Sequence, residues 1–342
     1  MKFRMIGIVV FLGLVSLGLN IRFRQAHPQP PASPSSAHIK FYGVKARVSL
    51  FRLNLPEKKG DTLLDLGTGV EYGEGVNSTS GAFRNGLYVS AVNIAKPESQ
   101  WAVCKWEIIE GKRPRQIASL RLHGRVPADI TLSPDTRYTA FSDQSEDGTV
   151  CLLDWRKQKV KLLKESGGQV VHGSVISCDN EGNVFMRRSG PSFASVFQVN
   201  ESTGRRRALL GFSDVVVLQK GNYGIRTEAK GDILSLRIEN LSSTKLPPLY
   251  YTCNFSRELS NGIVENALGG ETVCGVSFAS EDATWWGTTL YRQHDHIPYF
   301  VIWHHKTDEP EYFFHDRLTR LVKAVSIEPR FTERGNPNST SK

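Results

Sequence analysis

A group of histidines near the C-terminus contains the side chains best suited to metal chemistry. Five of the nine histidines fall within residues 294–315: His294, His296, His304, His305 and His315. Asp295 and Asp316 lie beside them in the chain. Imidazole and carboxylate groups this close together in the chain can bind a transition metal. Residues 298–304 have the pattern of a β-strand, so at about 3.3 Å per residue the groups before and after them would lie about 26 Å apart.

That distance divides the histidines into two sets. His294 and His296 precede the strand, whereas His304 and His305 come at its far end, so the two pairs cannot share one ion. His315 ends the next antiparallel strand and returns to the side of His294. The sequence therefore predicts one candidate metal site, made of His294, His296 and His315. The alternative is that these histidines lie in turns and contact only water.

Two other motifs resemble parts of catalytic or cofactor-binding sites. Residues 63–69, Leu-Leu-Asp-Leu-Gly-Thr-Gly, look like the nucleotide loop of S-adenosylmethionine-dependent methyltransferases. However, Glu71 occupies the place of a third glycine, and residues 72–81 cannot form the helix that must follow. We interpret the motif as a strand that ends in a glycine-rich connection. Residues 275–279 lack the final glycine of a nucleophile elbow, so neither motif predicts a catalytic residue or a cofactor.

The five cysteines form no recognisable zinc or redox motif, because no two of them are spaced as Cys-x-x-Cys. We interpret most of them as small buried strand residues. Cys253 and Cys274 bracket an irregular stretch, and they could close it as a disulfide outside the cell.

The formal net charge of +9 does not predict a nucleic-acid partner. Four of the positive charges flank the first hydrophobic segment, and the remaining excess of about +5 is spread thinly over the chain. These four are Lys2, Arg4, Arg22 and Arg24. We interpret the denser basic groups, Arg205–Arg207 and the lysines at 157, 159 and 161, as a loop and an exposed strand face.

The N-terminus predicts attachment to a membrane. Residues 5–21 carry no charged side chain and would span about 25 Å as a helix. We expect residues 1–24 to be a signal anchor, or else a cleaved signal peptide, that places the following domain outside the cytoplasm. Residues 25–40, rich in Pro and Ser, predict an extended linker, and residues 331–342 predict a flexible polar tail.

Residues 41–330 have the pattern of a single all-β domain. Short Val-, Leu-, Phe- and Tyr-rich runs alternate with Gly, Asn, Asp and Pro turns, as at residues 86–92, 149–155 and 298–303. One short helix is expected at residues 256–268. Trp285 and Trp286 could line a sugar or peptide groove, but tryptophans in a strand more often fill a core.

A repeat of about forty residues has the period of a propeller blade. Its best copy covers residues 130–163, and weaker copies begin near Leu87, Ser174, Val215 and Val273. Residues 48–53 and 62–66 look like the two outer strands of a blade without its inner strands. Residues 321–327, at the other end of the domain, look like a missing inner strand. We therefore predict a β-propeller closed by both ends of the domain, with six blades and with five or seven as alternatives.

Residues 130–155 resemble the blade repeats of TolB-type and WD-repeat-like β-propellers. The matching positions are Ser133-Pro134-Asp135, Phe141-Ser142, Asp147-Gly148 and Asp154, whereas Thr136 stands where those repeats have glycine. The resemblance covers about a tenth of the chain. It implies a propeller scaffold and no particular activity, because such scaffolds support both binding and catalysis.

Two functions are compatible with this sequence. The first is a membrane-tethered or exported propeller that binds a protein or a small ligand on one face and performs no chemistry. The alternative is a small propeller hydrolase or lyase, in which a divalent metal is held by the three predicted histidines. A chelator-sensitive activity would favour the enzyme, whereas metal-free protein that co-purifies with cell-envelope proteins would favour the scaffold.

Overall fold

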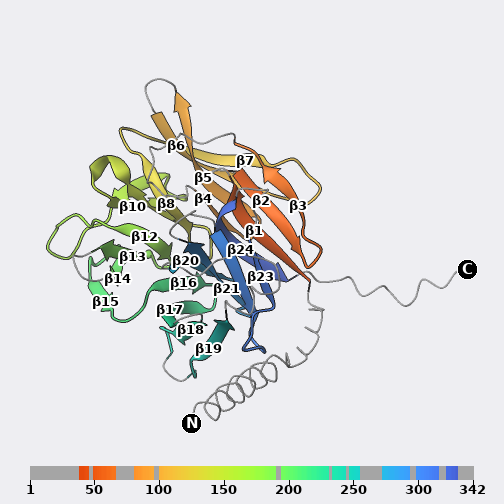
Figure 1. Cartoon of the computed structure of the whole chain (residues 1–342). Helices are drawn as coiled ribbons and strands as arrows, with labels where there is room; N and C mark the ends of the chain where they lie inside the picture. The colour runs from red at the N-terminus through yellow and green to blue at the C-terminus, as the bar shows by residue number, and fades with distance from the viewer. Residues whose placement is uncertain are drawn as a thin grey trace, which may run out of the picture. The chain divides into compact units, whose positions relative to one another are not determined.

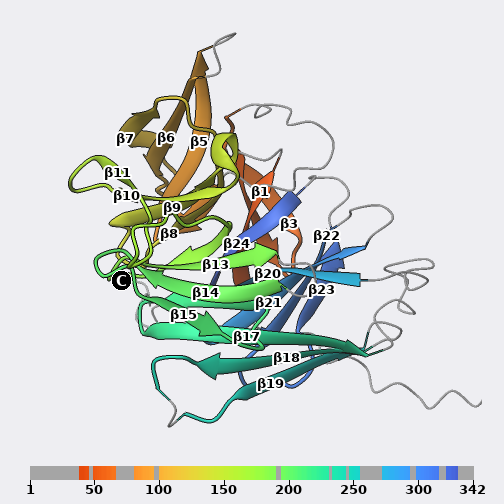
Figure 2. The same ribbon diagram turned by 90° about the vertical axis from the view of Figure 1, so that its left-hand side faces the viewer.

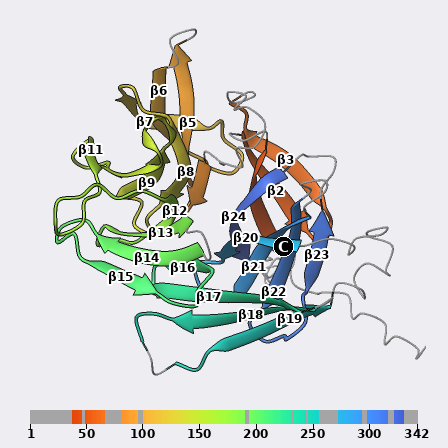
Figure 3. The ribbon, with the colours of Figure 1, turned by 60° about the vertical axis from the view of Figure 1, so that its left-hand side comes forward.

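The computed structural model describes residues 38–45, 49–66, 81–95, 100–189, 194–230, 233–243, 246–254, 272–292, 298–315 and 321–329. These residues form six four-stranded antiparallel sheets. The innermost strands of the sheets contact one another in a closed circle around an axis (Figure 1 and Figure 3). The domain is therefore a six-bladed β-propeller, as the repeat predicted.

From the axis outward, the strands of each blade follow the order of the chain, except that the last strand is the innermost of blade 1. Blade 1 has β24 (Leu321–Pro329), β1 (Ile39–Lys45), β2 (Ser49–Leu55) and β3 (Lys59–Leu64); blade 2 has β4 (Gly81–Arg84), β5 (Leu87–Ala95), β6 (Gln100–Glu107) and β7 (Arg115–Leu122); blade 3 has β8 (Pro127–Leu132), β9 (Tyr138–Asp143), β10 (Thr149–Asp154) and β11 (Lys159–Leu162). Blade 4 has β12 (Ser174–Cys178), β13 (Asn183–Ser189), β14 (Ala194–Asn200) and β15 (Arg206–Leu209); blade 5 has β16 (Asp214–Leu218), β17 (Gly221–Lys230), β18 (Ile233–Asn240) and β19 (Leu249–Asn254); blade 6 has β20 (Thr272–Ala279), β21 (Trp285–Arg292), β22 (Pro298–His304) and β23 (Tyr312–His315).

Both ends of the domain contribute to blade 1. β24 pairs with β1 along its whole length, from Ile39 opposite Pro329 to Lys45 opposite Leu321. Figure 1 shows the blue β24 beside the orange strands β1 to β3. The sequence predicted this closure and identified β24, but it left one inner strand of the blade unassigned. That strand is β1, so the N-terminal end supplies three strands and the C-terminal end supplies one.

The blade starts agree with the predicted repeats in three of the four weaker copies. Ser174, Val215 and Val273 lie on the innermost strands of blades 4, 5 and 6. Leu87, in contrast, begins the second strand of blade 2, because the inner strand β4 precedes it. With only four residues, β4 is too short to give a clear alternating pattern.

Large apolar side chains fill the space between neighbouring blades. Trp286 and Trp303 are fully buried in the cluster that joins blades 5 and 6. Trp285 is buried with Phe41 in the cluster that joins blade 6 to blade 1. The Phe41 ring lies 5.0 Å from that of Phe300, centroid to centroid, in an edge-to-face arrangement. The tryptophan pair therefore fills the core, as preferred from the sequence, and does not line a groove.

Several predicted features lie outside the described residues. They are the N-terminal anchor, the expected helix at residues 256–268 and the glycine-rich residues 67–80 that follow β3. Among the residues that are described, no helix has the length and apolar character needed to cross a membrane.

Candidate functional site

The turns that join the first to the second strand of each blade gather around one mouth of the central channel. They comprise residues 85–86, 133–137, 179–182, 219–220 and 280–284, in blades 2 to 6. Because strands alternate in direction, the turns between the third and fourth strands lie on this same side of the propeller. We call this side the turn face. Blade 1 has no such inner turn, because the domain begins at β1 and ends at β24.

Side chains link these turns from blade to blade. Asn85 Nδ2 donates to Pro134 O at 3.3 Å, and Asp135 N donates to Asn180 Oδ1 at 2.8 Å. These two bonds join blade 2 to blade 3 and blade 3 to blade 4. Asn222 Nδ2 then donates to Asp179 Oδ2 at 3.2 Å, which joins blade 5 to blade 4.

An ion pair completes this circuit across the blade that lacks a turn. Gln219 N donates to Glu281 Oε2 at 3.3 Å, which joins blade 5 to blade 6. Glu281 Oε1 lies 2.8 Å from Arg84 Nε, so the carboxylate also connects blade 6 to blade 2. Blade 1 stands between blades 6 and 2 in the ring. The Arg84–Glu281 pair therefore connects the two neighbours of the composite blade.

Arg84 also closes the channel at the turn face. Its Nη2 donates to the Val217 carbonyl on β16, in the blade opposite its own. Burial lowers the pKa of Arg84, and the charge of Glu281 opposes that shift. The cavity behind Arg84, lined by the innermost strands, measures only about 80 Å³. This volume is well below the roughly 300–1,000 Å³ of small-molecule pockets, so the cavity does not suit a ligand.

Further polar side chains form hydrogen bonds with backbone groups on the side of the innermost strand β16 that faces the axis. The carbonyl of residue 213, which precedes β16, and those of residues 215 and 217 on β16 accept from Arg187, Ser177 and Arg84, respectively. The neighbouring Asp214 carboxylate accepts from Ser277 N of blade 6 at 2.6 Å, and burial raises the pKa of Asp214. These bonds satisfy backbone groups that no strand partner reaches. We interpret them as structural.

A polar cleft of about 390 Å³ opens on the turn face between blades 4 and 5, which Figure 2 shows side by side. We call it the 4–5 cleft. Its lining is mostly charged or amide-bearing: Asp179, Asn180, Glu181, Asn183, Gln198, Arg207, Gln219, Lys220, Asn222 and Ser242, with Pro134, Phe185, Leu218, Gly221 and Leu241. The side chains come from three blades, so no linear motif in the sequence could have indicated this site.

A second cleft on the same face, about 430 Å³ between blades 1 and 2, has most of its charges already paired, Lys112 excepted. Glu110 lies 2.8 Å from both Lys40 and Arg52, and Arg52 also holds Asp61 at 3.1 Å. Tyr42, whose pKa burial raises, donates its hydroxyl to Glu328 at 2.8 Å. A ligand there would have to break these contacts, so we favour the 4–5 cleft as the candidate site.

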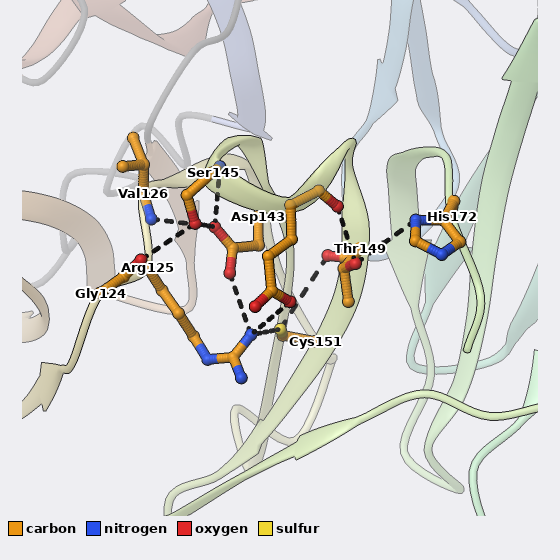
Figure 4. A network of polar contacts seen from close by, with 9 residues as sticks. Gly124, Arg125, Val126, Asp143, Ser145, Thr149, Cys151 and His172 are labelled. Atoms are coloured by element: carbon orange, nitrogen blue, oxygen red, sulfur yellow. Dashed lines mark hydrogen bonds and ion pairs between the residues drawn. The ribbon is translucent and has the colours of Figure 1, made fainter. Parts of the chain in front are cut away.

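A network on the opposite face resembles a catalytic arrangement but lacks the required contacts (Figure 4). Asp143 is fully buried and accepts from Arg125 Nη1 at 2.9 Å and from Val126 N at 3.0 Å. His172 contacts Thr149 Oγ1 at 3.3 Å, while that hydroxyl already donates to the Glu146 carbonyl. In the hydrogen bonds of the described residues, Asp143 makes none to His172. The network joins β8 to β9 and is structural.

The thiols of the described part are also unsuited to nucleophilic chemistry. Burial raises the pKa of the Cys151 and Cys178 thiols to about 12 and raises that of Cys104 as well. A thiol with so high a pKa stays protonated near neutral pH, and the thiolate is the nucleophile. The interpretation as buried strand residues is confirmed for these three. The Cys274 side chain lies outside the described residues, so its disulfide with Cys253 stays a prediction.

The predicted metal ligands are only partly placed. His294 and His296 lie outside the described residues, and His315 is the last residue of β23, opposite Tyr299 near the start of β22. His304 ends β22 at the opposite side, as the strand geometry required, and burial lowers its pKa. Within the described ranges no three His, Cys, Asp or Glu residues are grouped to hold a metal ion. The three-histidine site stays a prediction.

The repeat copy predicted near Val273, in blade 6, has a closer match to the best copy than the sequence analysis recognised. In residues 133–138 the serine hydroxyl donates to the following aspartate at 2.7 Å and accepts from the Tyr138 amide at 2.9 Å. In residues 280–285 the same bonds measure 2.5 and 3.0 Å. Thr136 and Ala283 both adopt left-handed φ values, 60° and 61°. The shared signal is Ser-x-Asp followed three residues later by an aromatic, without the usual glycine.

Comparisons with known proteins add fold-level similarity and no assigned family. No family model and no curated protein matches the chain. Among solved structures, TolB from Acinetobacter baumannii is 10% identical, covering 87% of this chain and 68% of that one, with a TM-score of 0.47. A protein from Lactobacillus plantarum is 11% identical, covering 85% and 82%, with a TM-score of 0.44. The dihydro-heme d1 dehydrogenase NirN is 10% identical, covering 90% and 78%, with a TM-score of 0.40.

The Arg84–Glu281 pair generates a stability prediction. We expect Glu281→Gln to lower the free energy of unfolding by about 2–4 kcal/mol, because the buried Arg84 loses its counter-charge. Adding Arg84→Met should recover part of this loss, since the uncompensated charge is then removed. Urea denaturation followed by tryptophan fluorescence measures both.

Glu107→Gln is the matched control, because Glu107 pairs with the exposed Arg115 and its loss should cost less than about 1 kcal/mol. Equal unfolding midpoints for Glu281→Gln, Glu107→Gln and the unsubstituted protein would show that the pair does not hold the ring together.

Proposed function

We propose that this protein is a binding scaffold without catalytic activity, tethered to a membrane by residues 1–24, whose ligand occupies the 4–5 cleft. The cleft is the observation that carries the proposal. Its polar groups stand on rigid strands and turns, and the adjoining channel is closed by Arg84. Rigid support lowers the entropy lost on binding, which favours a preformed site.

The cleft has spare capacity to bind a partner. In the described part of the chain, Gln198, Arg207 and Lys220 take part in no side-chain hydrogen bond or ion pair. Gln219 uses only its backbone N–H, toward Glu281, which leaves its amide side chain available. These side chains reach the surface, so water satisfies their hydrogen bonds, and a ligand can replace that water.

The tether rests on the sequence of the N-terminus. The uncharged residues 5–21 are preceded by Lys2 and Arg4, which favours a cytoplasmic N-terminus and an exported propeller. The propeller begins at Ile39 of β1 on the turn face, so β1 includes the last two residues of the predicted linker, 39 and 40. A cleaved segment would instead give a secreted scaffold with the same binding face.

The tether is tested by membrane extraction of the full chain. We expect it to stay in the membrane fraction after alkaline carbonate washing. The variant Leu12→Arg/Leu14→Arg should be released, since each central arginine costs roughly 2.5–3.5 kcal/mol of insertion energy. Leu12→Ala/Leu14→Ala is the control that keeps the segment apolar. Release of the unsubstituted protein by carbonate would contradict a retained anchor.

The binding face is tested by photocrosslinking in the producing cells. A photoreactive residue in place of Gln219, at the rim of the cleft, should give a discrete adduct, because a ligand in the cleft would lie within its reach. Gln116, exposed on the outer strand β7 of blade 2, is the matched control and should give none. Equal adduct yields at both positions, or no adduct at Gln219, would contradict the proposed face.

A further inference from the structure

We infer that the 4–5 cleft binds an acidic sugar, a hydroxyl-rich ligand that carries a carboxylate. This inference rests on the proposed function and names the ligand class of the same site. It depends on three features: amides held in fixed positions, two cations without partners, and the scarcity of exposed apolar surface.

Two amides of the cleft, those of Asn183 and Asn222, are oriented by one buried carboxylate. Asp179 is 7% exposed and accepts from the backbone N–H groups of Glu181 at 3.0 Å and Asn183 at 2.9 Å. Its second oxygen accepts from the side-chain amides of Asn183 at 2.7 Å and Asn222 at 3.2 Å. Because Asn222 uses its Nδ2 group here, its Oδ1 oxygen is left to accept a hydrogen bond from a hydroxyl.

Blade 4 adds a row of side chains at one level of its sheet. The strand register places Phe185 opposite Gln198, and Gln198 opposite Arg207. Neighbours in such a row lie on the same face of the sheet, about 5 Å apart. The row therefore sets an amide and a guanidinium side by side on the wall of the cleft, above a buried aromatic ring.

The cations are positioned to receive a carboxylate. Arg207 comes from the outer strand of blade 4 and Lys220 from the inner turn of blade 5, and both are exposed without an ion pair in the described part. Strand alternation sends the adjacent Arg206 to the other side of β15, where it lies 3.0 Å from Glu165 and stacks on Phe197. The basic run at 205–207 thus leaves one arginine, Arg207, for the cleft.

The remaining surface favours a sugar over a peptide. Phe185 and Leu218 are 1% and 3% exposed, so the cleft offers almost no apolar pocket. Peptide partners usually depend on apolar or aromatic anchors that enter such pockets. A saccharide, in contrast, can satisfy amide, hydroxyl and Glu181 carboxylate groups through its hydroxyls. The volume of about 390 Å³ lies at the small-ligand end of binding pockets.

Isothermal titration calorimetry on the full-length protein in detergent tests the inference with three probes: digalacturonate, the neutral disaccharide galactobiose, and a tetrapeptide of glutamate. We expect digalacturonate to bind roughly tenfold or more tightly than either alternative, because only it combines the carboxylates with the hydroxyls. Arg207→Gln should weaken digalacturonate binding roughly ten- to hundredfold, since a charge-assisted hydrogen bond is lost. Arg206→Gln, the neighbour on the opposite side of the strand, should leave it unchanged.

Four outcomes would overturn the inference. They are equal affinity for galactobiose, tighter binding of the peptide, equal effects of Arg206→Gln and Arg207→Gln, and no binding of digalacturonate. Circular dichroism of both variants verifies that they are folded. If digalacturonate fails while the Gln219 crosslink forms, only the ligand class is wrong. If both fail, the proposed binding face is wrong as well.

Discussion

The pairing of β24 with β1 is the contact on which the rest of the structure depends. It joins the two ends of the domain along the whole of β1, with Ile39 opposite Pro329 at the turn face. Without it blade 1 would lack its innermost strand, and the edge of β1 would be open. The other turn contacts join adjacent blades. At blade 1, whose described part has no inner turn, the contact must instead run from blade 6 to blade 2. Arg84 and Glu281 make that contact.

Closure also explains why the candidate site lies between blades. Each sheet packs against the next through large apolar side chains, so the relative positions of neighbouring blades are fixed. Polar groups from blades 4 and 5, beside Pro134 of blade 3, can then form one cleft without forming any local motif. The narrow channel, closed by Arg84, leaves the face of the disc as the accessible surface. Asp179 has two roles: it links blade 4 to blade 5 through Asn222, and it orients the amides of Asn183 and Asn222 in the cleft.

The sequence predicted those features that repeat along the chain or depend on strand alternation. The six blades, the closure by both ends, the best repeat in blade 3 and the opposite placement of His304 all follow from local patterns. β4 was missed because four residues give too little alternation. The copy in blade 6 was predicted near Val273, but its match to residues 133–138 was not recognised, because that match consists of only a few turn residues. The cleft could not be predicted, since Gln198, Arg207 and Asn222 become neighbours only through pairing between distant strands. The basic run at 205–207 was predicted to be an exposed loop; it is exposed, but Arg206 and Arg207 lie on strand β15, whose alternation sends them to opposite sides.

A disulfide trap tests the closure most directly. Lys40 and Glu328 are opposite each other in the pairing of β1 with β24. The double variant Lys40→Cys/Glu328→Cys should therefore oxidise under mild conditions and give one linked peptide containing both positions by mass spectrometry. Lys40→Cys/Lys161→Cys, whose second position is on blade 3, should not form such a link. Absence of the 40–328 peptide, or equal yields from the two variants, would contradict a ring closed by strands from both ends of the domain.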